Sequence, residues 1–173
     1  MPEVAVKRDL ASLSHREALR IAIVIEERNA HIYHRLAEIF SRSCPDSPQI
    51  PSAFYELANT EREHGATLTA RHLERFGAVH ADITEEDIWD FIEVPSLRVA
   101  DISAAVEAGD GARARRMAFE MALAAERSAV NYYGRLVENT SDPELKALYK
   151  EFVAFEQEHT DWAQQALGQL GHI

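Results

Sequence analysis

The chain has 173 residues, of which 46% are hydrophobic, and its formal net charge is -11. This length suits a single domain, residues 1–173, with a full hydrophobic core. No apolar run approaches the roughly 18 residues that a membrane-spanning helix needs. The acidic balance disfavours nucleic acid and anionic membranes as partners and favours cations. Solubility explains the same charge equally well.

The N-terminal residues 1–13 lack the apolar core of a secretory signal peptide. We expect them to form a short, mobile leader. The single cysteine, Cys44, lies in a polar stretch and cannot form a disulfide within the chain. Both features predict a cytoplasmic protein.

The first predicted helix extends from Ser14 to about Ser41, and Ser14 and Glu17 have the spacing of a capping box. Several of its apolar residues lie outside the main stripe: Ile21, Val24, Ile25, Ile32 and Ile39. A helix that is apolar on several sides is usually buried on several sides. We therefore expect this helix to contact a second subunit in a homodimer. The alternative is burial under a long connection of the same chain.

Three more long helices are predicted from turn residues and caps: from near Pro51 to the residue before Gly77, over residues 112–137, and from Pro143 to about Gly168. The last of these is capped by Asp142.

Residues 78–111 form a crossover between the second and third long helices. Short helices are expected at residues 85–92 and 97–107, with Trp89 and Phe91 anchoring the segment to the bundle. A connection of this length lets the third long helix run parallel to the second. The predicted fold is all-α, a four-helix bundle with a long crossover between helices 2 and 3.

Two of the predicted helices carry the motif Glu-x-x-His: Glu61 with His64, and Glu156 with His159. Residues three apart lie on the same side of a helix, so this carboxylate and imidazole can bind one cation together. About one such motif is expected by chance, so a single copy would mean little. Two copies, each preceded by a further helix with its own glutamate, are a much stronger signal.

The other two long helices supply these further glutamates, Glu26 and Glu126, each seven residues before a tyrosine, Tyr33 and Tyr133. Neighbouring residues repeat as well: Ala22, Arg35 and Leu36 match Ala122, Arg135 and Leu136, and Glu56 and Glu63 match Glu151 and Glu158. The chain therefore consists of two related halves. We interpret the two tyrosines as packing residues, and Glu63 and Glu158 as solvated or subunit-contact residues.

Six side chains are the predicted metal ligands, and we expect them to carry any catalysis: Glu26, Glu61, His64, Glu126, Glu156 and His159. Bundles with one Glu from each of two helices and a Glu-x-x-His from each of the other two bind two iron or manganese ions. Carboxylate and imidazole ligands suit iron or manganese, and zinc can substitute. The alternative is surface charge on amphipathic helices. The apolar neighbours Leu57, Phe152 and Phe155 argue against it.

This pattern resembles the ferritin-like superfamily, and within it the rubrerythrin-type proteins, over about residues 15–168. The resemblance implies a ferritin-like bundle with two Fe ions, Glu61 and Glu156 as bridging ligands, and each histidine on one metal. Rubrerythrin also has a C-terminal rubredoxin domain with four Cys, which the single Cys44 cannot supply. A further family Glu, one turn after the third-helix ligand, is replaced here by Ala129.

The resemblance implies a di-iron protein that oxidises Fe(II) with peroxide or O2 and needs a separate electron-donor protein. Three alternatives stay open: iron storage or delivery, a hydroxylase of the ubiquinone-biosynthesis type, and a non-catalytic metal-binding module. Only residues 168–173 follow the last predicted helix. We therefore do not expect the short fifth helix of cage ferritins, which disfavours a storage cage.

Overall fold

Long α-helices dominate the fold. The structure, a computed structural model, describes residues 8–80, 82–93 and 95–170 and has no strand within these ranges. In chain order the elements are the 3-10 helix η1 (Leu10–Ser12), α1 (His15–Ser43), α2 (Gln49–Phe76), the 3-10 helix η2 (Glu86–Asp90), α3 (Val99–Glu107), α4 (Gly111–Asn139) and α5 (Pro143–Leu170). The predicted all-α class is confirmed. Within the described ranges, no helix combines the length and apolar character needed to cross a membrane.

The ends of the long helices follow the local sequence. Ser14 caps α1, because its hydroxyl accepts the backbone N–H of Glu17 at 3.2 Å and the Glu17 carboxylate accepts the N–H of Ser14 at 2.9 Å. Asp142 caps α5 by accepting two backbone N–H groups at 3.0 Å. Gly77 ends α2 with a φ of 79°, which residues with a side chain rarely adopt.

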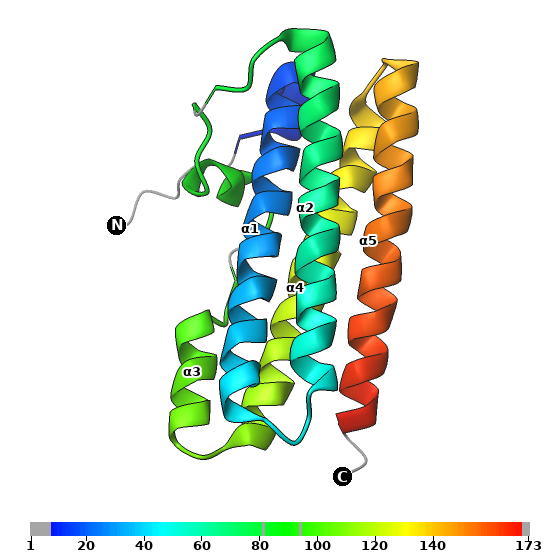
Figure 1. Cartoon of the computed structure of the whole chain (residues 1–173). Coiled ribbons are helices and arrows are strands. Elements are labelled where there is room, and N and C mark those ends of the chain that lie inside the picture. Colours follow the sequence, from blue (N-terminus) through cyan, green and yellow to red (C-terminus); the bar gives the residue numbers. More distant parts are fainter. Residues whose placement is uncertain (1–7, 81, 94, 171–173) are drawn as a thin grey trace, which may run out of the picture.

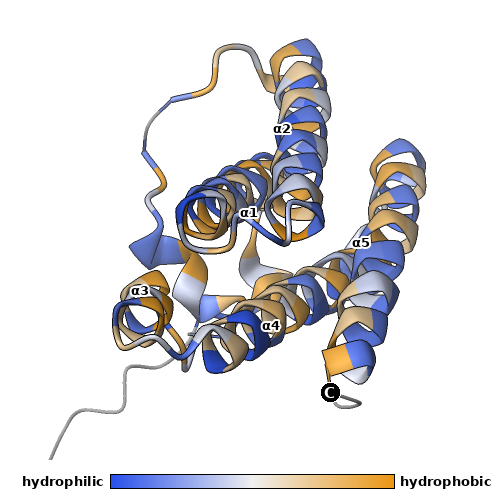
Figure 2. Cartoon of the chain, turned by 60° about the horizontal axis from the view of Figure 1, so that its bottom comes forward, coloured by the Kyte–Doolittle hydropathy of each residue, from blue (hydrophilic) through white to orange (hydrophobic). Residues whose placement is uncertain are grey.

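The four long helices form two antiparallel pairs (Figure 1). Helix α1 packs along α2, and α4 packs along α5, whereas the two pairs approach each other less closely. Helices α2 and α4 run in the same direction, because the crossover carries the chain back past α1 to the far end of the bundle. Figure 2 shows the two pairs facing each other in a view turned toward the end of the bundle. The predicted bundle with one long crossover is confirmed.

The crossover covers part of α1. Ile88 of η2 is fully buried and belongs to the same apolar cluster as Ile21, Val24 and Ile25 of α1. These three residues are therefore buried within one chain, and a second subunit is not needed to cover them. The crossover contributes Ile88, Phe91 and Ile92 to this cluster, which agrees with the alternative explanation, burial under the chain's own crossover. The homodimer itself stays a prediction.

A buried arginine of α1 helps to hold the crossover in place. The guanidinium of Arg28 lies 3.3 Å from Glu85 and 4.8 Å from the ring centroid of Trp89. Phe91 is 4% exposed, and its ring lies 6.4 Å from that of Tyr132 on α4. Trp89 and Phe91 thus anchor the crossover as predicted.

The short helices of the crossover are shorter than predicted. Only part of residues 85–92 is helical, the element η2. It is a 3-10 helix rather than an α-helix, because the Asp87 N–H bonds to the Thr84 carbonyl and the Phe91 N–H to the Ile88 carbonyl, each three residues earlier. Helix α3 begins at Val99, two residues later than expected. The carboxylate of Asp101 accepts the N–H of Arg98 at 2.9 Å, which makes Arg98 the residue before the helix.

The leader is partly ordered. Asp9 caps η1 by accepting the N–H of Ala11 at 3.1 Å. Leu10 is only 3% exposed and belongs to the apolar core. The expectation of a mobile leader is therefore wrong for residues 8–13, because Leu10 is buried against the bundle. Residues 1–7 lie outside the described residues.

Two apolar clusters fill the bundle on either side of its middle. On α1, Ile25 belongs to the first cluster and Tyr33 to the second, with Glu26 between them. On α5, Phe152 belongs to the first cluster and Ala163 to the second. The candidate ligands of each helix therefore lie at the boundary between the clusters, deep inside the protein.

Candidate metal centre

The structure brings all six predicted ligands together at the boundary between the two clusters: Glu26 from α1, Glu61 and His64 from α2, Glu126 from α4, and Glu156 and His159 from α5. The four glutamates have no exposed surface, and His64 is 8% exposed. The side chain of His159 is 15% exposed. Burying several carboxylates in this way is costly unless positive charge balances them.

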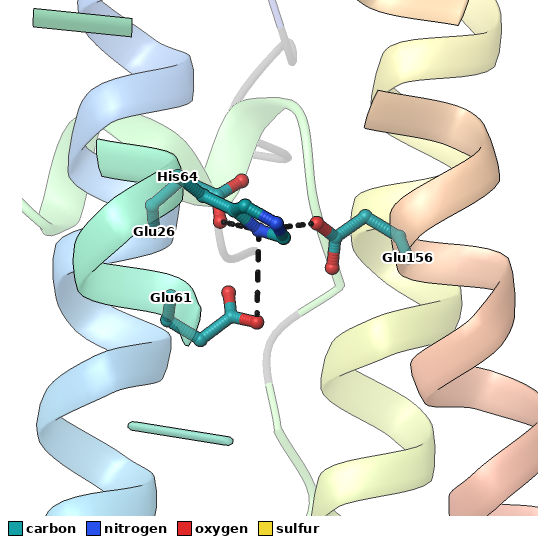
Figure 3. A group of neighbouring side chains, drawn as sticks. All are labelled: Glu26, Glu61, His64 and Glu156. Carbon is teal, nitrogen blue, oxygen red and sulfur yellow. Dashed lines mark ion pairs between the residues drawn. The ribbon is translucent and has the colours of Figure 1, made fainter. Parts of the chain in front are cut away.

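His64 faces three of the glutamates (Figure 3). Its Nδ1 lies 3.1 Å from Oε1 of Glu156, 3.4 Å from Oε2 of Glu26 and 4.0 Å from Oε1 of Glu61. One ligand atom from each of these four residues lies within 4.8 Å of all the others. The four side chains can therefore converge on one cation.

His159 has an equivalent environment. Its Nδ1 lies 3.0 Å from Oε1 of Glu61, 3.5 Å from Oε2 of Glu126 and 3.7 Å from Oε2 of Glu156. These four residues form a second group that meets the same 4.8 Å limit. Glu61 and Glu156 belong to both groups. The two groups are therefore adjacent positions of one centre that share two carboxylates.

The closest contact of each histidine crosses between the helix pairs. His64 lies nearer to Glu156 on α5 than to Glu61 of its own motif. His159 lies nearer to Glu61 on α2 than to Glu156 of its own motif. Helical spacing puts each Glu and His on one face, and the packing of α2 opposite α5 then interleaves the two motifs.

Tyr33 and Tyr133 are fully buried and each bonds to a glutamate on the opposite helix. The hydroxyl of Tyr33 donates to Oε1 of Glu126, and that of Tyr133 donates to Oε1 of Glu26. Burial and the neighbouring carboxylates raise the pKa of both tyrosines well above the usual range, so both stay donors. In each of these glutamates Oε2 has no hydrogen-bond partner. That oxygen is the one nearest a histidine.

The bonds of these tyrosines to Glu126 and Glu26 are the part of the candidate site that the sequence did not predict. The tyrosines were interpreted as packing residues, but they also orient two of the candidate ligands. The signal was present as the spacing of Glu26 to Tyr33 and of Glu126 to Tyr133. It suggested a relation within one helix, whereas each bond joins α1 to α4.

Burial has the largest influence on the shared glutamates. It raises the pKa of Glu61 well above its usual range, and the charges of the neighbouring glutamates raise it further. Burial and the charge of Glu26 raise the pKa of Glu156 to about 8. Burial also acts to raise the pKa of Glu126, but contacts with His159 and other neighbours outweigh it and the pKa is lowered. Without a cation, burial therefore disfavours the charged form of both shared carboxylates.

The pKa values of the two histidines are raised as well, which for an imidazole favours the charged form. Burial opposes the charged imidazolium, but the adjacent carboxylates outweigh it. Glu156 and Glu26 raise the pKa of His64 to about 9. Three glutamates raise the pKa of His159 to about 12. The centre therefore attracts positive charge, which protonated histidines provide when no metal is bound.

The unpartnered atoms of the centre fit bound metal. Several buried atoms have no hydrogen-bond partner: Oε2 of Glu26 and Glu126, both oxygens of Glu61 and Glu156, and Nδ1 of His64 and His159. Buried polar atoms are nearly always bonded. Two metal ions between these atoms would satisfy them together, and the mixture of carboxylate and imidazole suits iron or manganese.

Residues near the motifs have simpler roles. Glu63 and Glu158 are exposed, as expected for solvated side chains. Ala129 occupies the position of the additional family glutamate, is fully buried, and has no donor atom to offer. The centre is therefore built from four glutamates and two histidines.

Comparison with protein families agrees with this geometry. A family model described as Rubrerythrin matches residues 17–114, which is more than half of the chain. The match contains α1 from residue 17 onward, α2 and the crossover, and therefore Glu26, Glu61 and His64. No curated protein and no solved structure matched the chain. The second half supplies the corresponding side chains, Glu126, Glu156 and His159, through the internal repeat. The chain belongs to the rubrerythrin family.

Proposed function

We propose that this protein is a di-iron oxidoreductase that reduces peroxide or O2 with electrons from Fe(II). One observation carries the proposal: two buried groups of metal-binding side chains share Glu61 and Glu156. Two ions held by common carboxylates lie close enough to act on one small molecule. The rubrerythrin family match supports a di-iron centre of this kind.

Charge balance favours a pair of divalent ions. Four carboxylates carry about four negative charges, which two divalent ions neutralise. Iron is the proposed metal, and manganese or zinc can occupy the same ligands. The acidic chain, with a net charge of -11, favours the approach of cations.

Each ligand has a proposed role in this centre. Glu61 and Glu156 would help to hold both ions, because each belongs to both groups. Glu26 and Glu126 would each help to hold one ion, and each offers the Oε2 that is not bonded to a tyrosine. Each histidine would help to hold one ion and offers Nδ1, the ring nitrogen that faces the glutamates.

The bound iron pair would supply two electrons and an open position for peroxide or O2. Reduction of one peroxide to two waters takes two electrons and two protons.

The proposed reaction would need a separate electron donor to reduce the iron again. This sequence has one cysteine, too few for the four-cysteine iron site of a rubredoxin domain. We propose that a small redox protein of another chain supplies the electrons. The four glutamates lie between two apolar clusters and have no exposed surface, which limits the water around them.

Stopped-flow spectroscopy tests the proposal. Anaerobic protein carrying two Fe(II) per chain is mixed with peroxide and, separately, with O2. We expect faster oxidation by peroxide. Rapid oxidation by O2 together with slow reaction with peroxide would make O2 the oxidant of the centre and exclude peroxide reduction as its main activity. Failure to bind two Fe(II) would overturn the di-iron proposal.

A pair of variants provides the control for this experiment. Glu156→Gln removes a shared carboxylate and should abolish rapid oxidation. Glu158→Gln changes an exposed residue two positions further along α5 and should leave the rate unchanged.

A further inference from the structure

The internal repeat allows the two metal positions to be compared residue by residue. Residues 95 apart correspond, since Glu61 and His64 match Glu156 and His159. The residue before each shared glutamate then differs sharply between the halves: Phe155 on α5 corresponds to Thr60 on α2. Phe152 likewise corresponds to Leu57.

Aromatic rings cover His64. The ring of Phe155 stacks on the His64 imidazole, with centroids 5.1 Å apart and an angle of 19° between the planes. Phe152 adds a second ring at 5.2 Å from His64 and contacts Phe155 at 5.8 Å. Phe155 itself is 40% exposed, so its ring lies between His64 and solvent.

His159 has no such cover. Within the described part of the chain, its one aromatic neighbour is His64, at 5.7 Å. Its side chain is 15% exposed, compared with 10% for His64. Thr60, the counterpart of Phe155, bonds to its own helix by donating to the Glu56 carbonyl at 3.1 Å. A threonine has no ring with which to cover an imidazole.

The position of Phe155 matters because α2 and α5 belong to different helix pairs. Their backbones approach each other much less closely than those of α1 and α2 or of α4 and α5. Side chains must therefore close this side of the bundle above the centre. Phe155 reaches from α5 to His64 on α2 and so covers the gap between these helices beside His64. Beside His159 no equivalent ring covers the gap, because Thr60 takes the place of Phe155.

We infer that Phe155 makes the two metal positions inequivalent: its ring shields the position at His64 from solvent, whereas the position at His159 exchanges its metal and meets small dissolved ligands faster. This inference rests on the proposed two-metal centre. The physical reason is access, because a chelator, peroxide or water must reach the ion to replace a ligand. The stacked ring also restricts rotation of the His64 imidazole and so slows its dissociation from the metal.

Metal release under anaerobic conditions tests the inference without relying on activity. Co(II) is the probe for two reasons. Like Fe(II), it is a divalent first-row metal ion that binds imidazole and carboxylate ligands. Its visible absorption also changes with its coordination. Protein with two Co(II) per chain is mixed with excess EDTA. We expect two phases of equal amplitude, a fast one from the His159 position and a slow one from the His64 position.

Two reciprocal substitutions exchange the residues of the repeat. Phe155→Thr should speed the slow phase by about tenfold or more, the scale on which residues around metal ligands act, and leave the fast phase unchanged. Thr60→Phe should slow the fast phase. Leu73→Thr is the control, because Leu73 is 58% exposed on α2 and lies outside the centre. It should change neither phase.

The outcomes separate this inference from the proposed function. Binding of fewer than two Co(II) by the unaltered protein would overturn the two-metal centre. Two Co(II) released in a single phase, or two phases that Phe155→Thr leaves unchanged or speeds equally, would overturn the inequivalence and leave the centre intact. Thr60→Phe adds a ring at a half-buried position, so it keeps the test decisive if circular dichroism shows that Phe155→Thr is misfolded.

Discussion

At the scale of single residues, the tyrosines explain how two buried glutamates keep one orientation. Tyr33 binds Oε1 of Glu126 and Tyr133 binds Oε1 of Glu26, which leaves the two Oε2 atoms facing the histidines. The arrangement joins α1 to α4 twice, once in each direction. The carboxylates of these two candidate ligands are thereby held in one orientation.

Replacing these tyrosines with phenylalanine should separate orientation from packing. We expect Tyr33→Phe and Tyr133→Phe each to weaken metal binding by about 10–100-fold, because the partner glutamate loses its orienting bond. Competition with a chelator measures the affinity. Tyr132→Phe is the matched control: its hydroxyl donates to the Ala18 carbonyl at 2.9 Å, outside the centre. It should lower the free energy of unfolding by about 1 kcal/mol and leave metal affinity unchanged.

The shared glutamates lead to a second prediction at this scale. Glu61→Ala should reduce the content from two metals per chain to one or fewer, because Glu61 belongs to both groups. Glu26→Ala should affect chiefly the position at His64, since Glu26 belongs to that group alone. Elemental analysis after gel filtration gives the content, with exposed Glu63→Ala as the control. Retention of two tightly bound metals by Glu61→Ala would show that the ligand assignment is wrong.

At the scale of elements, the crossover completes the core and the long helices build the centre. Ile88 of η2 is fully buried among apolar residues of α1, although η2 is a single short turn. Arg28 of α1 adds an ion pair with Glu85 and lies over the ring of Trp89. The crossover therefore contributes to stability and takes no part in the ligand set.

Ile88→Ala tests whether the crossover contributes to stability without contributing to the metal site. We expect the free energy of unfolding to fall by about 2–5 kcal/mol, the usual loss for a large aliphatic side chain cut back in a core. Two metals per chain should still bind. Chemical denaturation measures the first effect and elemental analysis the second. Glu86→Ala changes an exposed residue of the same turn and should cost little. Loss of metal from a folded Ile88→Ala protein would show that the crossover does contribute to the metal site.

At the scale of the whole molecule, the centre is a charged layer between two apolar clusters. Four glutamates with no exposed surface occupy the level at which all four long helices pass from one cluster to the other. Such a layer is destabilising by itself and becomes favourable when cations fill it. The stability of the bundle should therefore depend on metal more than on any single apolar contact.

Removal of metal should lower the melting temperature, and the loss should grow with pH. Bound metal stabilises by about 2.7 kcal/mol per site at a concentration 100-fold above Kd. In the metal-free protein the pKa of Glu156 is raised from 4.5 to about 8 and that of His64 from 6.5 to about 9. Each group has a higher pKa in the folded than in the unfolded protein. Its contribution to stability is complete at a pH below the unfolded-state pKa and is lost as the pH rises through the folded-state pKa.

Thermal unfolding followed by circular dichroism checks this dependence. The metal-free protein should melt at progressively lower temperature between pH 6.5 and 9. Glu156→Gln, which does not titrate, should have a shallower slope. A melting temperature that rises over this range would contradict the raised pKa values.

Much of the fold and the identity of the candidate ligands follow from short-range rules. Ser14, Asp142 and Gly77 mark helix ends through bonds or backbone angles that involve only nearby residues. The spacing of Glu and His within a helix depends on 3.6 residues per turn and nothing else. These features could be predicted because their physical cause lies within a few residues of each position.

Tertiary packing alone decided the remaining relationships, because they join residues that are far apart in the chain. The bond from Tyr33 to Glu126, the contact of His64 with Glu156 and the stacking of Phe155 on His64 all cross between helix pairs. The burial of Ile21, Val24 and Ile25 of α1 depends on tertiary packing in the same way, because their cluster joins α1 to the crossover and to the other long helices. The periodicity of a sequence predicts which face of a helix is apolar or charged. Which helix faces contact each other depends on how the whole helices pack.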